Sequence, residues 1–287
     1  MITLQNKTLT ATIATKGAEL QSLINTTTNL QYMWSGDAKY WGKYSPVLFP
    51  IVGGLKNDTY YYEGKAYTLP RHGFARDREF TVKQITDAEA LFTLTDDDSS
   101  RAVYPFAFTL GLRYKLEGNN LQCTYEVYNP GSEVLLFSVG AHPAFAVPLT
   151  GNTVYTDYYL QFNAAENLQR FKLDNGLIAA PEALPVNNNI LPLQQSLFYE
   201  DAIVLKHMQS SSITIGCNKN SHGINFKFDD FPFFGIWAAK DAPFVCLEPW
   251  CGIADSVHTN QQLINKEGII KLAANAHWQR QWQVECF

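Results

Sequence analysis

Short runs of alternating apolar and polar residues recur along the chain and predict β-strands. In such runs every second side chain is apolar, as expected for a strand with one buried face. Turn-forming segments such as Glu117–Asn120 and Asn129–Gly131 separate these runs at short intervals. The predicted strands are Thr8–Ile13, Leu91–Thr95, Phe106–Leu116, Leu121–Tyr128, Ser212–Cys217 and Trp278–Cys286.

Helical periodicity is scarce, so the pattern favours an all-β fold, a sandwich or barrel of antiparallel sheets. The least strand-like region runs from Asn163 to Glu200 and is rich in proline and asparagine. We expect a long excursion there, with a short helix near Leu193–Phe198. Strand signals resume afterwards with the same composition, and no repeat divides the chain. The pattern therefore predicts a single domain over residues 1–287.

Composition and charge narrow the classes of function. The chain has 22 Lys and Arg against 27 Asp and Glu, with no basic block, so nucleic acid is not an expected partner. No run of about 18 apolar residues is present, which argues against a membrane partner, and Met1–Ala14 does not read as a signal peptide. The five cysteines form no CxxC pair, which predicts free thiols and a reducing cytoplasm. The sequence leaves the oligomeric state open.

Several widespread catalytic motifs are absent. The chain has neither of the glycine-rich phosphate loops, GxxxxGK[ST] and GxGxxG, so we expect no nucleotide cofactor. It also lacks the GxSxG turn of serine hydrolases and the HExxH motif of zinc proteases. The sequence therefore gives no support to a serine hydrolase or to a zinc protease of this kind.

Two histidines lie where a loop could shape a pocket. His72 stands between Arg71 and Gly73, with Arg76 four residues on, and this segment could offer hydrogen-bond donors to a polyhydroxylated or anionic ligand. His142 follows an apolar strand, Val134–Val139, and precedes a proline, which predicts a ring at a strand end. Either histidine could instead be a structural residue in a turn.

One carboxylate stands out because it closes an apolar strand. Glu248 follows Phe244–Leu247 and precedes Pro249 and Trp250. A buried carboxylate is costly unless it is paired or hydrogen-bonded. Glu248 is therefore either exposed at the strand end or held in a buried position for a function.

Together these segments resemble the aldose 1-epimerase family, also called galactose mutarotases. The resemblance is greatest to the branch that holds the bacterial LacX proteins and the hexose-6-phosphate epimerases. It covers nearly the whole chain, and the GxHPxF and EPW elements are its most specific parts. The matching segments are Gly17–Leu20, Ser45–Pro50, His72–Arg76, Tyr104–Phe106, Gly140–Phe145, Gly235–Trp237 and Glu248–Trp250.

The resemblance implies a large twisted antiparallel β-sandwich with a sugar cleft on one sheet. It implies that His142 is the catalytic acid and Glu248 the catalytic base, and that His72 binds substrate. It implies no cofactor and no metal. The partner would be a small sugar or a sugar phosphate, and the reaction would interconvert its α and β anomers by opening the ring.

Four further residues are expected to contact the sugar. Asp201 precedes an apolar strand, as a substrate-binding aspartate does in this family, and Trp237 belongs to the matched GIW segment. Lys56 stands where many galactose mutarotases have arginine, which casts doubt on galactose as the substrate. Arg76, in the segment His72–Arg76, matches an arginine of the phosphosugar and LacX branch that lies near the cleft. Arg76 could pair with a phosphate or a sugar hydroxyl.

Three other functions remain open. A sugar-binding or regulatory protein could use the same cleft without turnover. Glycoside hydrolysis needs two carboxylates, which Glu248 and Asp201 could supply, but it gives His142 no role. A metal site could be built from His72, His142 and Glu248, as in some non-haem iron enzymes.

Overall fold

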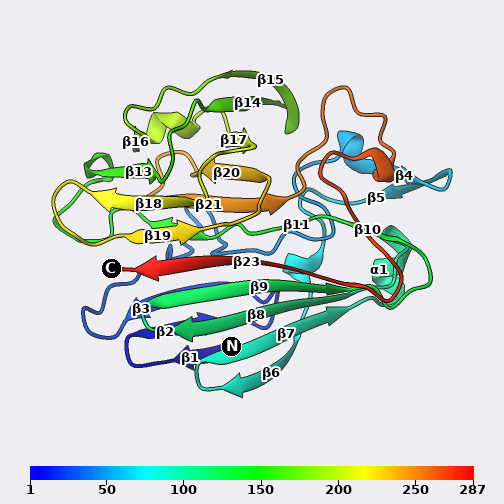
Figure 1. Ribbon diagram of the computed structural model, residues 1–287, viewed down its shortest axis with the longest axis horizontal. Coiled ribbons are helices and arrows are strands. Elements are labelled where there is room, and N and C mark those ends of the chain that lie inside the picture. Colours follow the sequence, from blue (N-terminus) through cyan, green and yellow to red (C-terminus); the bar gives the residue numbers. More distant parts are fainter.

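The computed structural model describes residues 1–287 and is built mainly of antiparallel strands (Figure 1). The larger sheet has nine strands in the order β16-β13-β18-β19-β23-β9-β8-β7-β6. Their bounds are β6 Thr81–Thr86, β7 Glu89–Thr95, β8 Thr109–Glu117, β9 Asn120–Tyr128, β13 Tyr158–Phe162, β16 Ile190–Pro192, β18 Ser212–Cys217, β19 Ile224–Lys227 and β23 His277–Cys286.

A second sheet of seven strands has the order β11-β21-β20-β17-β14-β15, and β12 also pairs with β21. Their bounds are β11 Val139–Gly140, β12 Ala144–Ala146, β14 Gln169–Asp174, β15 Leu177–Ala183, β17 Ile203–Lys206, β20 Phe233–Trp237 and β21 Phe244–Cys251. Every residue of β21 is buried. β21 has paired strands on both sides, so its position fixes the direction of its side chains on both faces of the sheet.

The two large sheets pack against each other through aromatic side chains. Phe228, just after β19, lies with its ring centroid 4.3 Å from that of Phe234 on β20, and Phe226 on β19 lies 5.8 Å from Phe145 on β12. One cluster of 72 buried hydrophobic residues extends from Leu4 to Cys286. The large antiparallel sandwich predicted from the strand pattern and the resemblance is confirmed.

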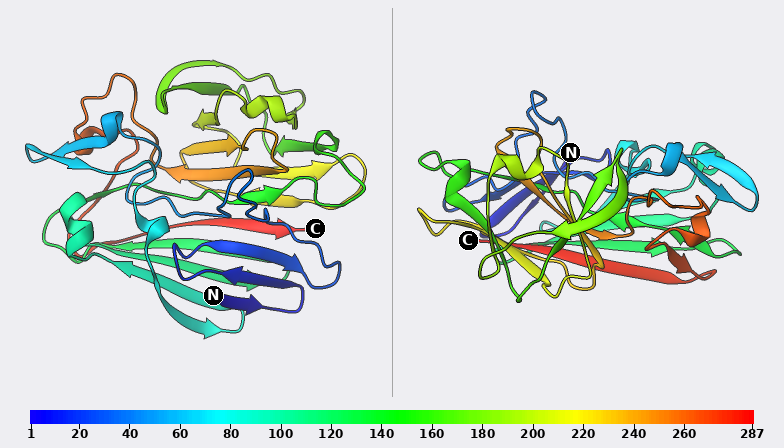
Figure 2. Two further views of the ribbon diagram at one scale, coloured as in Figure 1. Left: turned by 180° about the vertical axis from the view of Figure 1, so that it is seen from behind. Right: turned by 90° about the horizontal axis from the view of Figure 1, so that it is seen from above.

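Smaller elements surround the two sheets (Figure 2). A three-stranded N-terminal sheet, coloured blue, lies against the nine-stranded sheet, and two strand pairs, β4-β5 and β10-β22, stand at its other end. The remaining strands are β1 Ile2–Gln5, β2 Leu9–Ile13, β3 Leu20–Asn25, β4 Thr59–Tyr62, β5 Lys65–Thr68, β10 Leu135–Phe137 and β22 Ile270–Leu272. The helices are α1 Asp98–Val103 and the 3-10 turns η1 Lys56–Asp58, η2 Ala75–Asp77, η3 Tyr155–Asp157, η4 Gln195–Phe198 and η5 Leu263–Asn265.

The strands expected from alternation are present, because the alternation corresponds to real one-sided burial. In β9 every second residue is buried, and its hairpin partner β8 is reached through a turn with Gly118 at a φ of +58°. The structure places the start of β8 at Thr109, three residues later than Phe106, where the predicted strand began.

No helix in the chain has the length and apolar character needed to cross a membrane.

The expectation of a strand-poor excursion over 163–200 is wrong. This segment contains β14, β15 and β16, and only the short helix near its end is found, as the 3-10 turn η4. Prolines led to the error, because Pro181 and Pro192 argue against central strands. They lie in β15 and β16, which are the edge strands of the two sheets, where a missing N–H breaks no ladder.

Candidate active site

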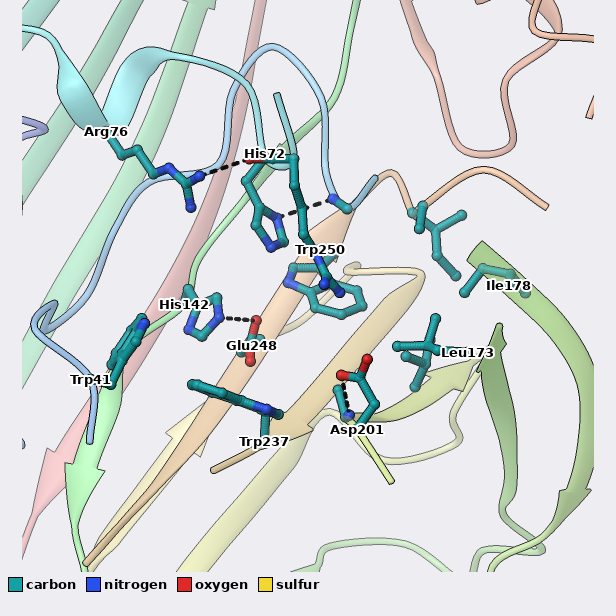
Figure 3. A pocket seen from close by; sticks show the side chains of 16 residues that line it. Trp41, His72, Arg76, His142, Leu173, Ile178, Asp201, Trp237, Glu248 and Trp250 are labelled. Atoms are coloured by element: carbon teal, nitrogen blue, oxygen red, sulfur yellow. Dashed lines mark hydrogen bonds and ion pairs between the residues drawn. The ribbon is translucent and has the colours of Figure 1, made fainter. Parts of the chain in front are cut away.

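A cavity of about 280 Å³ opens on the face of the seven-stranded sheet that points away from the larger sheet. This volume is close to the lower end of the range typical of small-molecule sites, roughly 300–1,000 Å³. Figure 3 shows the side chains that line it. They are Trp41, Gly53, Arg71, His72, Arg76, His142, Leu173, Ile178, Asp201, Ala202, Val204, Trp237, Glu248, Trp250, Ile253 and Ala254.

Strand alternation places the floor of the cavity. In the β20-β21 register, Gly235 is opposite Glu248 and Phe233 is opposite Trp250. The side chains of Phe233, Glu248 and Trp250 therefore project from one face of the sheet. Two glycines make room for the indole of Trp250: a Cβ added at Gly235 would lie 2.4 Å from its ring, and one added at Gly140 would lie 2.7 Å from it. Trp250 can therefore lie flat beneath the site only because both positions lack a side chain.

His142 and Glu248 are cross-strand neighbours. Gly140 pairs with Trp250 and Ala144 pairs with Cys246, so the intervening residues place His142 directly across from Glu248. The proline after His142 interrupts the strand, and the imidazole turns into the cavity (Figure 3). His142 Nε2 lies 3.3 Å from Glu248 Oε2.

Burial dominates the protonation of this pair. It raises the pKa of the Glu248 carboxyl well above its usual value, and the charge of Arg71 and the indole of Trp250 only partly oppose this. Burial likewise lowers the pKa of His142 to about 3, because the surrounding wall disfavours an imidazolium. Both shifts favour the neutral forms of the pair, in which the Glu248 carboxyl carries the proton.

His72 is fixed as a hydrogen-bond donor toward the cavity. Its Nδ1 accepts the backbone N–H of Gly53 at 3.1 Å, so the ring proton is on Nε2. Burial and the nearby ring of His142 keep the pKa of His72 well below its usual value. The φ of His72 is +69°, and Gly73 follows at +70° with no room for a Cβ beside Phe49. This turn is specific for glycine and holds the imidazole in place.

Two arginines bring positive charge to the cavity. Arg76, on η2, donates from Nη2 to the carbonyl of Arg71 at 2.8 Å, and its Nε is buried without a hydrogen-bond partner. Arg71 also lines the cavity and lies near Gly176. Positive charge beside a carboxyl that is held protonated favours an anionic or strongly polar ligand.

Aromatic and strained residues complete the walls. Trp41 stacks on the His142 ring with centroids 4.9 Å apart, and Trp237 meets the same ring edge-on at 5.6 Å. Asp201 has a φ of +125°, a conformation that costs a non-glycine residue about 1–3 kcal/mol. Its carboxylate also accepts the N–H of Ala202 at 2.7 Å. A strained carboxylate facing a cavity is typical of a functional position.

Of the residues expected to contact a sugar, Lys56 alone lies elsewhere. Its Nζ donates to the carbonyl of Val257 at 3.2 Å, and it does not line the cavity. The cation expected from Lys56 comes instead from Arg71, which directly precedes His72 in the sequence and so had a visible signal. Trp41 was missed because nothing local in the sequence places it against His142, about 100 positions away. Trp250 was missed although it had a signal, since it lies in the EPW element two residues after Glu248.

The metal site considered from His72, His142 and Glu248 does not form as such. The Nδ1 of His72 is occupied by Gly53, and the donor atoms that do approach one another, within 4.8 Å, belong to His142, Cys246 and Glu248. Burial raises the pKa of the Cys246 thiol well above its usual value. That thiol is protonated at neutral pH and is a poor metal ligand in this state.

The chain is similar to known proteins over most of its length. The family model for aldose 1-epimerase matches residues 1–270. The plasmid-encoded LacX protein of Lactococcus lactis subsp. lactis is 34% identical over 282 residues, which is 94% of each chain.

Two solved structures share the fold along their whole length. A galactose mutarotase related enzyme from Lactobacillus acidophilus is 33% identical, with a TM-score of 0.95 over 99% of this chain and 96% of that one. A galactose mutarotase-like protein from Lactobacillus casei is 34% identical, with a TM-score of 0.93 over 100% of both chains. The sequence motifs, the sandwich and these matches agree, and the chain belongs to the aldose 1-epimerase family.

Proposed function

We propose that this protein is an isomerase that interconverts the α and β anomers of a hexose or a hexose phosphate. The observation that carries the proposal is the buried pair formed by His142 Nε2 and Glu248 Oε2, 3.3 Å apart at the floor of a cavity of about 280 Å³. In a sugar hemiacetal, the C1 hydroxyl and the ring oxygen O5 are both bonded to C1. An adjacent acid and base can therefore serve both oxygens of one sugar.

Ring opening moves one proton at each of these oxygens. Glu248, as a carboxylate, takes the proton from the C1 hydroxyl, the C1–O5 bond breaks, and O5 receives a proton from His142 Nε2. The product is an open-chain aldehyde, with Glu248 protonated and His142 neutral. After rotation about C1–C2, the O5 hydroxyl adds to the other face of the carbonyl, and the two residues exchange roles.

The proton inventory of the pair supports this cycle. The pKa of Glu248 is raised and that of His142 is lowered to about 3, so the pair holds a single proton over a wide pH range. The charged form, carboxylate and imidazolium, has the same number of protons as the neutral form. The sugar and Arg71 would favour the charged form by surrounding the carboxylate with hydrogen-bond donors.

The remaining lining residues suit a sugar with an anionic group. His72 presents an Nε2–H donor for a hydroxyl or the ring oxygen, and Asp201 offers an acceptor on the opposite wall. Trp41 and Trp237 supply flat apolar surface against the C–H faces of the sugar ring. Arg76, with Arg71, gives a place for a phosphate, and this favours a hexose phosphate over a free hexose.

A panel of sugars tests the reaction and the preference together. Exchange NMR would measure anomer interconversion of glucose, galactose and their 6-phosphates, each with and without protein. We expect at least one to exchange faster, with the phosphorylated form preferred. If sugars bind but none exchanges faster, the protein is the sugar-binding alternative.

We also propose that the protein works in the cytoplasm, since all five cysteines are buried free thiols.

A further inference from the structure

A buried ion pair lies behind the wall of the cavity, outside its lining. Lys266 Nζ is 2.7 Å from Asp255 Oδ1, and each side chain is only 3% exposed. Replacing a buried ion pair with apolar residues is often neutral or stabilising, so the pair is weak evidence for stability. The backbone groups that are hydrogen-bonded to Asp255 give a better indication of its role.

Asp255 joins three segments of chain at the cavity wall. Its N–H donates to the carbonyl of Gly54 at 2.9 Å, and its carbonyl accepts the N–H of Ile178 at 2.8 Å. Its second carboxylate oxygen accepts the backbone N–H of Lys56 at 3.0 Å. Ile178 lines the cavity, and so does Gly53, which directly precedes Gly54 and stands three residues before Lys56.

Gly53 carries this connection to His72. Its N–H donates to His72 Nδ1 at 3.1 Å, and its carbonyl accepts the N–H of His72 at 2.9 Å. The contact behind it is close, because a Cβ added at Gly53 would lie 2.5 Å from the Cβ of Ala254, the residue before Asp255. A shift of Asp255 would therefore displace Gly53, and with it the imidazole.

We propose that the Asp255–Lys266 pair is a positioning element of the active site, which acts through Gly53 to hold His72 with its Nε2–H directed at the sugar. The inference rests on the proposed function for the identity of the ligand, but the positioning itself is a property of the empty protein. Asp255 supplies the hydrogen bonds, and Lys266 neutralises and orients its carboxylate.

Two neutral double variants separate positioning from charge and from folding. Asp255→Asn with Lys266→Gln keeps an acceptor for the Lys56 N–H and a polar partner beside it. Asp255→Leu with Lys266→Met fills the same space without any side-chain hydrogen bond and leaves the Lys56 N–H without this acceptor. Neither variant leaves an unpaired buried charge, which is the usual cause of misfolding when such a pair is broken.

The first measurement uses the protein without sugar. The ¹⁵N NMR signal of His72 Nδ1 reports whether that nitrogen accepts a hydrogen bond. We expect a wild-type signal in the Asn/Gln variant and a shifted signal in the Leu/Met variant. Val284→Ala, a core truncation in β23, is the control for general destabilisation and should leave the signal unchanged. The same His72 signal in both double variants overturns the proposal.

The second measurement uses turnover. We expect the Leu/Met variant to raise KM about tenfold over the Asn/Gln variant, because a sugar hydrogen bond is lost, with kcat changed less than about twofold. In a His72→Ala background this difference in KM should disappear, because the Leu/Met change and the loss of the imidazole remove the same hydrogen bond to the sugar. A difference that persists there overturns the route through His72. If the wild type catalyses no anomer exchange, the proposed function fails, whereas the NMR result still decides the positioning.

Discussion

Glu248 and His142 face each other across two adjacent strands, with Oε2 and Nε2 3.3 Å apart and both side chains buried. The β11-β21 and β12-β21 registers fix this relationship, since they flank the pair on either side. The acid and the base are thus positioned by the sheet itself, and a small set of measurements can test what they do.

Replacing the proposed acid should slow turnover strongly and leave sugar binding largely intact. His142→Asn keeps a polar side chain, but it is shorter than histidine at the position of Nε2 and cannot supply a proton to O5, so we expect anomer exchange to fall about 10²- to 10⁴-fold. Calorimetric titration with the preferred sugar should give a Kd within a few fold of wild type. The matched control is His277→Asn, at an exposed position on β23, which should behave as wild type. Near-normal exchange by His142→Asn would remove it from the mechanism.

The pH dependence should lack an acid limb near the ordinary histidine pKa. Because the pKa of His142 is lowered to about 3 and that of Glu248 is raised, the pair keeps one proton as the pH falls from 7 to 5. Exchange catalysis should therefore be flat over this interval and decline only when the pair loses its proton at higher pH. The check is kcat/KM against pH. A halving of the rate near pH 6.5, the value for a free imidazole, would contradict it.

Glu248→Gln should stabilise the protein at neutral pH. The folded-state pKa of Glu248 lies above its unfolded value of about 4.3, so its contribution to stability is complete below that pH and is lost as the pH rises toward the folded-state pKa. Glutamine has a similar shape and no proton to lose. Thermal unfolding should show a higher Tm than wild type at pH 7 and an equal Tm at pH 4 or below. A variant that is less stable at both values would argue that the carboxyl is not held protonated.

A methyl group at Gly235 should disturb the floor of the cavity. Its Cβ would lie 2.4 Å from the ring of Trp250, so the indole or the strand must move. We expect Gly235→Ala to lower the Tm by several degrees and to weaken sugar binding, as seen in melting curves and titration. Gly42→Ala is the matched control, since its nearest neighbour would be an ordinary contact at 3.8 Å. Equal behaviour of the two variants would mean that Trp250 does not depend on that space.

The sequence predicted the sandwich because alternation in strands such as β9 corresponds directly to one buried face. The prediction is wrong over 163–200, because prolines in β15 and β16 argue against strands when only the local sequence is considered. Proline excludes a central strand, but a local sequence does not reveal which strands lie at the edge of a sheet. That information is in the strand order, which is a property of the whole chain.

The residues of the candidate site likewise fall into those that the sequence predicted and those that it did not. His72, Arg76, His142 and Glu248 stand in short distinctive segments, and the structure brings them to one cavity. Lys56 was expected there because of its place in the family pattern, yet its side chain turns to the carbonyl of Val257. The contact between Trp41 and His142 joins residues that are far apart in the sequence, and neither segment alone predicts it.

The most direct test of the account is anomer exchange by Glu248→Gln beside the wild type, measured by saturation-transfer NMR with the sugar that the wild type prefers. The amide keeps the size of the side chain and its hydrogen bonding but cannot take a proton from the C1 hydroxyl. We expect the wild type to accelerate exchange, whereas Glu248→Gln should leave the uncatalysed rate unchanged although the sugar still binds. Exchange by Glu248→Gln at a rate close to that of the wild type would contradict it.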